Sequence, residues 1–211
     1  MAEVLDEGSN LESHTVNIYR TAATVKGGRR FSFGALVVVG DRNGKAGYGY
    51  AKSTEVPAAI EKAQKAARRN IRTFPMIGRT IPHEVQGRFS STTVRLLPAS
   101  PGTGVVAGGT VRAVLEMAGV SDCLTKLYGS SNKLNAVRAV FEGLDSLRTR
   151  EQVAELRGVE LATSDIEERV ERGQRFMPAV TGEKMQGPTN TIGQERRGGR
   201  GGQIGRASCR E

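Results

Sequence analysis

An Asn-Gly pair at positions 43 and 44 separates two strand-like runs, Phe31 to Val39 and Lys45 to Ala51. Asn and Gly tolerate the positive φ angles of a tight turn, so the pair predicts a β-hairpin. A third strand-like run, Thr15 to Thr24, comes earlier and is joined to the hairpin by Lys26 to Arg30. The beginning of the chain therefore predicts a three-stranded antiparallel sheet.

An amphipathic helix is expected after the strand Lys45 to Ala51. Pro57 suits a first helical turn, and Ser53 and Thr54 are candidate caps. One apolar face is predicted from residues spaced three or four apart: Val56, Ile60, Ala63, Ala67 and Ile71. The pattern lapses at Pro75 and Gly78, so residues 15–78 are interpreted as a first domain of three strands and one helix.

Residues 79–160 are interpreted as a second α+β domain. Its expected elements are, in order, strands at Thr80 to Val85 and Thr92 to Leu97, a helix closed by Gly119, a strand at Cys123 to Tyr128, and a helix capped by Asn132. The whole chain is thus predicted to be of the α+β class.

The two ends differ in composition from these domains. Residues 1–14 carry four acidic side chains and no Lys or Arg, and form an acidic extension. Residues 161–203 are rich in Gly, Arg and Gln and are predicted to be a flexible tail, with a charged helix at Ile166 to Arg175. Residues 204–211 look like the translation of a sequencing adapter, so Cys209 is interpreted as non-native.

Positive charge is concentrated in the first domain. The chain has 31 Lys and Arg against 22 Asp and Glu, a net charge of +9. Residues 15–78 hold five Lys and seven Arg but only Asp41, Glu55 and Glu61. Such crowding costs folding free energy and favours a nucleic-acid partner, although a merely solvated basic surface stays open.

The segment Lys26-Gly27-Gly28-Arg29-Arg30 is a candidate phosphate clamp, because two residues without a Cβ let a phosphate approach the backbone between cations. An ordinary solvated turn is the alternative.

Two aromatic pairs, Phe31 with Phe33 and Tyr48 with Tyr50, alternate along their strands and can either stack on bases or pack in the core. Both interpretations stay open for these aromatics, with core packing favoured.

No catalytic, metal or cofactor site is predicted. Gly102 to Ala107 fits a GxGxxA dinucleotide fingerprint and Asp122 follows at a suitable spacing, but the surrounding strand pattern is wrong for that fold. His14 and His83, the only histidines, have no second ligand at metal spacing. We therefore expect a non-enzymatic protein without cofactor.

The location is expected to be cytoplasmic. No apolar run approaches the roughly 18 residues of a membrane span, and the acidic start lacks the order of a signal peptide. The cysteines, Cys123 and Cys209, form no CxxC pair, which is typical of a reducing compartment.

A series of short blocks along the chain, taken together and in order, is more specific than any single motif. The blocks are Val25 to Arg29, Val38 to Asp41, Asn43-Gly44, Gly47 to Tyr50, Glu55 to Ile60, Ala67 to Asn70, Pro98 to Ser100, Gly102 to Gly104, Ala107 to Gly109, Arg112 to Glu116 and Tyr128 to Ser130. In this order they resemble the bacterial small-subunit ribosomal protein S5 family. The resemblance implies a double-stranded-RNA-binding-like first domain and a ribosomal α/β-sandwich second domain. It also implies a structural, RNA-binding role in the small ribosomal subunit that supports assembly, decoding accuracy and the messenger RNA entry path.

The resemblance implies particular site residues and partners. Those expected to contact ribosomal RNA or the messenger RNA path are Arg20, Lys26, Gly27, Gly28, Arg29, Arg30, Arg42, Lys62, Lys65, Arg68, Arg69 and Arg72. The expected contact with ribosomal protein S4 is made by Gly102, Gly104 and Arg112, with Gly104 in a close-packed loop, and ribosomal protein S8 is a further expected partner. The chain departs from the family at Arg30, at Pro101 and in its longer tail.

Overall fold

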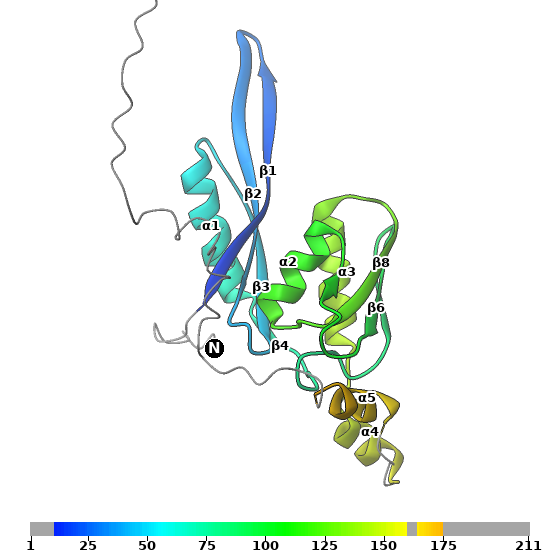
Figure 1. The fold of residues 1–211 in the computed structure, drawn as a ribbon. Helices are drawn as coiled ribbons and strands as arrows, with labels where there is room; N and C mark the ends of the chain where they lie inside the picture. Colours follow the sequence, from blue (N-terminus) through cyan, green and yellow to red (C-terminus); the bar gives the residue numbers. More distant parts are fainter. Residues whose placement is uncertain (1–10, 160–163, 175–211) are drawn as a thin grey trace, which may run out of the picture. The chain divides into compact units, whose positions relative to one another are not determined.

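Two four-stranded sheets and five helices make up the part of the chain that the computed structural model describes, residues 11–159 and 164–174 (Figure 1). The α+β prediction is confirmed. Of the predicted end segments, residues 1–10, 175–203 and 204–211, with Cys209, lie outside the described residues. No helix in the described part is long and apolar enough to cross a membrane.

The first sheet is antiparallel, in the order β1-β2-β3-β4. Its strands are β1 (Glu12–Val25), β2 (Gly28–Gly40), β3 (Lys45–Ser53) and β4 (Arg72–Thr73). The hairpin expected at Asn43-Gly44 is confirmed: the Asp41 carboxylate accepts hydrogen bonds from the N–H groups of Asn43 (2.8 Å) and Lys45 (3.0 Å). Gly44 has φ +94°, which explains the Gly at this position.

Helix α1 (Val56–Arg69) covers one face of this sheet. Ala59, Ala63 and Ala67 are buried against alternate β2 residues, Ala35 among them. Small side chains bring the helix close to the sheet, so close that a Cβ added at Gly49 would overlap the Ala63 carbonyl oxygen.

The predicted caps of this helix are wrong. Glu55 is the N-cap residue and its side chain makes no capping hydrogen bond, while Ser53 is the last residue of β3. Ile71 lies beyond the end of the helix, so the buried stripe consists of alanines rather than of the larger residues at positions 56 and 71.

The second sheet has the order β5-β6-β8-β7. Its strands are β5 (Val85–Phe89), β6 (Thr92–Pro98), β7 (Val105–Val106) and β8 (Cys123–Gly129), and two helices pack on it, α2 (Gly109–Ala118) and α3 (Lys133–Asp145). Both predicted helix ends are confirmed: Gly119 closes α2 at φ +93°, and the Asn132 side chain accepts a hydrogen bond from the Leu134 N–H at 3.1 Å.

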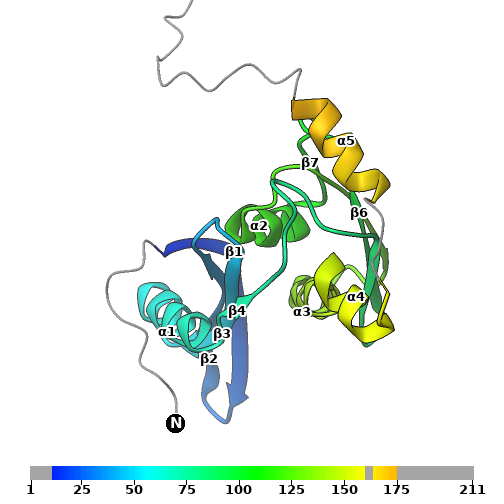
Figure 2. The ribbon, with the colours of Figure 1, turned by 90° about the horizontal axis from the view of Figure 1, so that it is seen from below.

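The helices α2 and α3 lie between the two sheets (Figure 2). Leu36 and Val38, on the face of β2 opposite α1, belong to the same buried cluster as Val114 of α2 and Phe141 of α3. Two backbone hydrogen bonds add to this contact, from the N–H of Arg42 to Met117 (3.1 Å) and from that of Gly44 to Ala118 (2.8 Å). The domain boundary near Gly78 stays a prediction.

Three local differences from the sequence prediction have simple causes. The strand expected over residues 80–85 begins only at Val85, because Thr80 turns back to pair with Ile77 and its hydroxyl donates to the Asp122 carbonyl at 2.7 Å. Strands β4 and β7 have two residues each, too few for a periodic signal.

Two short helices follow α3. Helix α4 (Arg150–Arg157) was not predicted, although Thr149 and Gln152 form a capping box at its start. Helix α5 (Asp165–Gln174) corresponds to the predicted charged helix.

Candidate nucleic-acid interface

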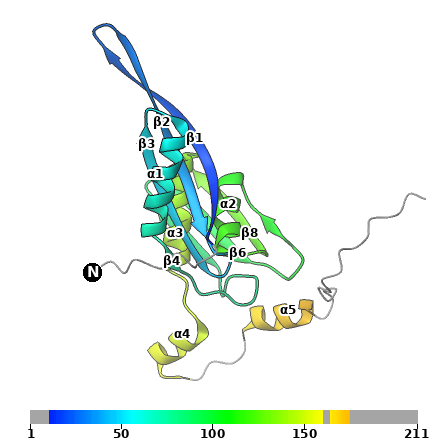
Figure 3. The ribbon, with the colours of Figure 1, turned by 90° about the vertical axis from the view of Figure 1, so that its left-hand side faces the viewer.

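The first hairpin continues past the rest of its sheet. The pairing of β2 with β3 stops at Phe33 and Ser53, whereas β1 and β2 stay paired as far as Val25 and Gly28. Residues 21–32 therefore form a two-stranded ribbon, and this ribbon together with Arg20 at its base is called the outer hairpin from here on. Five residues of strand correspond to about 17 Å, and Figures 1 and 3 show this ribbon reaching beyond β3 and α1.

The charge of the outer hairpin has one sign. Its charged residues are Arg20, Lys26, Arg29 and Arg30, all exposed, and no Asp or Glu occurs anywhere from Thr15 to Gly40. In the described part of the chain, the arginines seen in ion pairs are Arg42, Arg72, Arg95 and Arg150. Six of the residues expected to bind RNA, two of them glycines, belong to this hairpin, and their contact with RNA stays a prediction.

The turn of the outer hairpin is open on its outside. A Cβ added at Gly27 or Gly28 would meet no heavy atom within 4 Å. Gly28 has φ +149°, a conformation that favours glycine, whereas Gly27 has no positive φ. The turn therefore requires one glycine for its backbone, while the second keeps the outer surface of the turn free of a side chain.

A second basic surface runs along α1. Lys62, Lys65 and Arg69 are exposed and spaced at i, i+3 and i+7, which puts them on one stripe of the helix. Arg68 is exposed beside them. Arg72, which is also expected to contact RNA, lies in β4 and not on this helix.

Arg42 and Arg72 are held by acidic side chains. Arg42 lies in the turn between β2 and β3 and forms an ion pair with Glu12 at 2.6 Å. Arg72 forms an ion pair with Asp145 of α3. Both pairs are partly exposed, so each is weak and can exchange for a phosphate, but the structure does not bring these two arginines into the outer hairpin.

The loop around Gly102 and Gly104, which is expected to contact a protein, is held by a hydrogen bond to the buried Asp122 side chain. Gly104 (φ +76°) donates its N–H to the Asp122 carboxylate at 2.9 Å and accepts from the Cys123 N–H at 3.2 Å. Gly102 has φ +87°, and the Arg112 guanidinium donates to the Val105 carbonyl at 3.3 Å. These contacts tie Gly104 to the start of β8 and Arg112 to β7.

Two expectations for this loop change. A Cβ added at Gly104 would meet no heavy atom within 4 Å, so the loop is not close-packed there and the glycine is explained by its positive φ. Asp122 is 3% exposed and its carboxylate holds backbone, so it does not face outward as a ribose-binding acid would.

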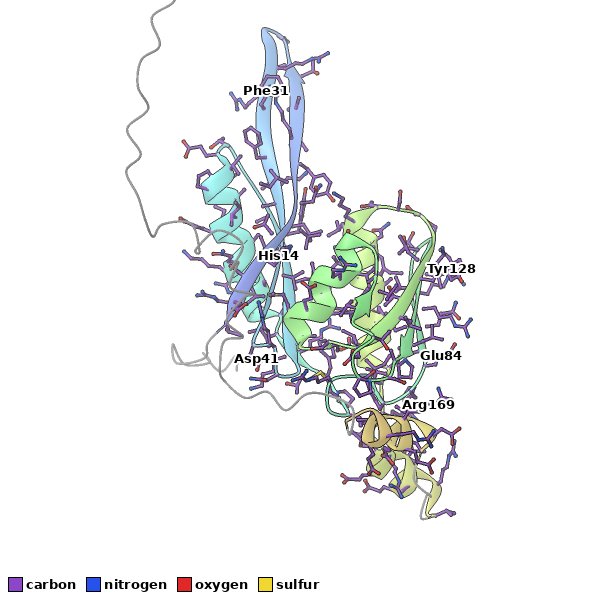
Figure 4. The ribbon with its side chains drawn as sticks, in the orientation of Figure 1. His14, Phe31, Asp41, Glu84, Tyr128 and Arg169 are labelled. Carbon is purple, nitrogen blue, oxygen red and sulfur yellow. The ribbon has the colours of Figure 1, made fainter. Side chains whose placement is uncertain are left out.

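The aromatic pairs divide between core and surface. Tyr48 packs on Phe141 with ring centroids 4.8 Å apart, and Tyr50 meets Tyr19 at 6.3 Å, which confirms the core interpretation for this pair. Phe31 is 43% exposed on the outer hairpin, where Figure 4 labels it. The core interpretation is wrong for Phe31.

The uncovered face of the second sheet was missed in the sequence. Leu124 and Tyr128 are exposed on β8, with Lys126 between them, and Val106 of the paired strand β7 is also exposed. Leu124, Lys126 and Tyr128 occupy alternate positions that follow buried Cys123, and this period of two could have indicated an exposed strand face. Figure 4 labels Tyr128 on this strand.

The described residues contain no group of three or more His, Cys, Asp or Glu side chains able to hold a metal ion. Burial raises the pKa of the Cys123 thiol to about 11, so this cysteine is protonated and unreactive at neutral pH.

Known proteins resemble the chain over both parts. Residues 11–75 match the N-terminal domain of ribosomal protein S5, and residues 87–157 match its C-terminal domain. Small ribosomal subunit protein uS5 of Psychromonas ingrahamii is 50% identical over 159 residues, which cover 75% of this chain and 95% of that relative. Because both domains match in order and the identity extends over nearly all of that relative, the chain belongs to the ribosomal protein S5 family.

Proposed function

We propose that this protein is a structural component of the small ribosomal subunit and that its outer hairpin binds the ribosomal RNA. The observation that carries the proposal is the charge of that hairpin: four exposed cations and no acidic side chain on a ribbon that only two strands build. Family membership supplies the ribosome as the setting.

The mechanism is neutralisation and placement. Lys and Arg bind phosphates through charge, and their binding releases counterions from the RNA. The turn at Gly27 admits a phosphate because no side chain covers it. The base of the ribbon belongs to a sheet that α1 packs on one side and α2 and α3 on the other, so a packed core holds the base from which these cations extend.

The stripe on α1 extends this surface. In the register of β1 and β2, Arg20 and Phe31 lie on the face of the ribbon that α1 covers further along. One RNA segment can therefore meet Lys62 and Lys65 as well as the hairpin. Arg42 and Arg72 join this surface only when they leave Glu12 and Asp145. A contact of these cations with the messenger RNA entry path follows from family likeness alone.

The loop from Gly102 to Arg112 is our candidate contact for ribosomal protein S4. It is anchored by Asp122 but open on its outside, and Val106 beside it is 53% exposed. Contact with ribosomal protein S8, and a role in assembly and decoding accuracy, follow from family likeness alone. A structural role rather than catalysis follows from the same family.

Sedimentation of the full chain tests the proposal against a free-standing RNA regulator. A tagged copy expressed in bacteria is expected to travel with small subunits through a sucrose gradient and to stay there after a high-salt wash. A regulator would bind a short RNA hairpin by itself and be found in the soluble fraction. Recovery only in that fraction would overturn the ribosomal assignment.

A further inference from the structure

On the outer hairpin, the guanidinium group of Arg20 lies over the exposed aromatic ring of Phe31. The carbon of the Arg20 guanidinium lies 3.9 Å from the centroid of the Phe31 ring. In the strand register Arg20 is opposite Phe33 and Phe31 is opposite Ala22, so the two are diagonal neighbours on one face. Phe33 is the last β2 residue that pairs with β3, so Arg20 lies at the base of the two-stranded ribbon and Phe31 lies beyond it.

Phe31 differs from the other phenylalanines of the described residues. Phe74 and Phe141 are buried, and Phe33 and Phe89 are half-buried, whereas Phe31 is exposed. Ala22, its cross-strand partner, offers a single methyl group and leaves much of the ring open. The exposed ring leaves apolar surface in water, and a partner that stacks on the ring would remove this surface from water.

The surroundings determine which partner fits. The other charged residues of the outer hairpin, Lys26, Arg29 and Arg30, are cations, so a polyanion is drawn to this face. A planar, weakly hydrated guanidinium stacks readily on flat groups, so the Arg20 guanidinium over the Phe31 ring offers a surface on which a flat ligand can stack. Flat, polyanionic ligands of this kind are nucleic acids, and a base is free to stack only where the RNA is unpaired.

We propose that Arg20 and Phe31 form a stacking platform for one unpaired base of RNA, in addition to the phosphate contacts of the neighbouring cations. This inference rests on the proposed function, since it needs RNA at the outer hairpin. The base stacks on the Arg20–Phe31 pair while Lys26 and Arg29 hold the phosphates on either side. Duplex RNA, whose bases are already stacked, does not use the platform.

Filter-binding titrations with small-subunit ribosomal RNA separate stacking from phosphate binding. Phe31→Leu removes the ring but keeps an apolar side chain, Phe31→Tyr keeps the ring, and Arg20→Lys keeps the charge but removes the planar fork. Loss of one stacked base corresponds to a fall in affinity of roughly tenfold. We expect that fall for Phe31→Leu and Arg20→Lys, near wild-type affinity for Phe31→Tyr, and an unchanged salt slope for all three.

The outcomes distinguish the two proposals. Wild-type protein that fails to bind this RNA would overturn the proposed function itself. Wild-type binding that Phe31→Leu leaves within twofold, or that Phe31→Tyr weakens as much as Phe31→Leu, would overturn the platform alone. A loss of affinity accompanied by a lower salt slope would also overturn it, since that result belongs to a phosphate contact. Thermal melting of each variant checks that the hairpin stays folded.

Discussion

The buried carboxylate of Asp122 accepts a hydrogen bond from the backbone N–H of Gly104 at 2.9 Å, across 18 residues of sequence. The next residue, Cys123, returns a bond from its own N–H to the Gly104 carbonyl. Both backbone groups of one loop residue are thus paired with the start of β8. The loop proposed to meet a protein partner is therefore held by the core of the second sheet.

Replacing Asp122 tests this anchor. Asp122→Ala leaves the Gly104 N–H without its partner, so the free energy of unfolding is expected to fall by about 1–3 kcal/mol, measured by urea denaturation. Asp122→Asn keeps an oxygen acceptor in the same place and is expected to lose less. Equal losses for the two variants would contradict the anchoring role.

Gly49 of β3 and Gly27 of the turn between β1 and β2 are expected to respond differently to alanine. A Cβ at Gly49 overlaps the backbone of α1 at Ala63, so Gly49→Ala is expected to cost about 1–3 kcal/mol or more, because helix and strand must move apart. Gly27→Ala adds a Cβ into open space and is the matched control, with stability close to wild type. Chemical denaturation measures the free energy of unfolding of both variants. A Gly49→Ala protein as stable as wild type would mean that α1 does not pack so closely on β3.

Because the Cys123 thiol is buried, we expect the free energy of unfolding to fall at high pH. The unfolded chain loses this proton near the ordinary pKa of 9.0, whereas burial raises the pKa of the folded thiol to about 11. Its contribution is complete below pH 9 and is lost as pH rises to 11, by about 2–3 kcal/mol.

Other groups titrate in the same range, so the comparison is between variants. Both proteins carry Cys209→Ser, and one also carries Cys123→Ala. The decline in unfolding free energy from pH 9 to 11 is expected to be smaller in the Cys123→Ala protein. Parallel declines in the two proteins would contradict the burial effect.

Local chemistry made much of the fold predictable. The Asn43-Gly44 turn, the Gly119 end of α2 and the Asn132 cap of α3 follow from backbone preferences that act within a few residues. The short strands β4 and β7 depend on partners distant in sequence and left no local pattern. Thr80 shows the same limit, because its bond to the Asp122 carbonyl overrides a strand-like local sequence.

The candidate site was predictable in charge but not in grouping. The basic composition of residues 15–78 indicated an excess of positive charge, and the structure places four of these cations on the outer hairpin without an acidic side chain. It could not separate Arg42 and Arg72, whose ion partners lie at Glu12 and Asp145. Strand periodicity also predicted the same burial for Phe31 and Tyr48. Their burial differs because it depends on whether a helix covers that point of the sheet.

The salt dependence of RNA binding tests the central claim most directly. In filter-binding titrations with small-subunit ribosomal RNA, the double variant Lys26→Ala, Arg29→Ala removes two proposed phosphate contacts. The slope of log affinity against log salt is expected to become shallower by roughly one unit per lost contact. The matched control, Lys126→Ala with Arg157→Ala, removes two exposed cations outside the proposed surface and is expected to keep the wild-type slope. An unchanged slope in the hairpin variant, or an equal change in the control, would contradict the assignment of the outer hairpin to RNA.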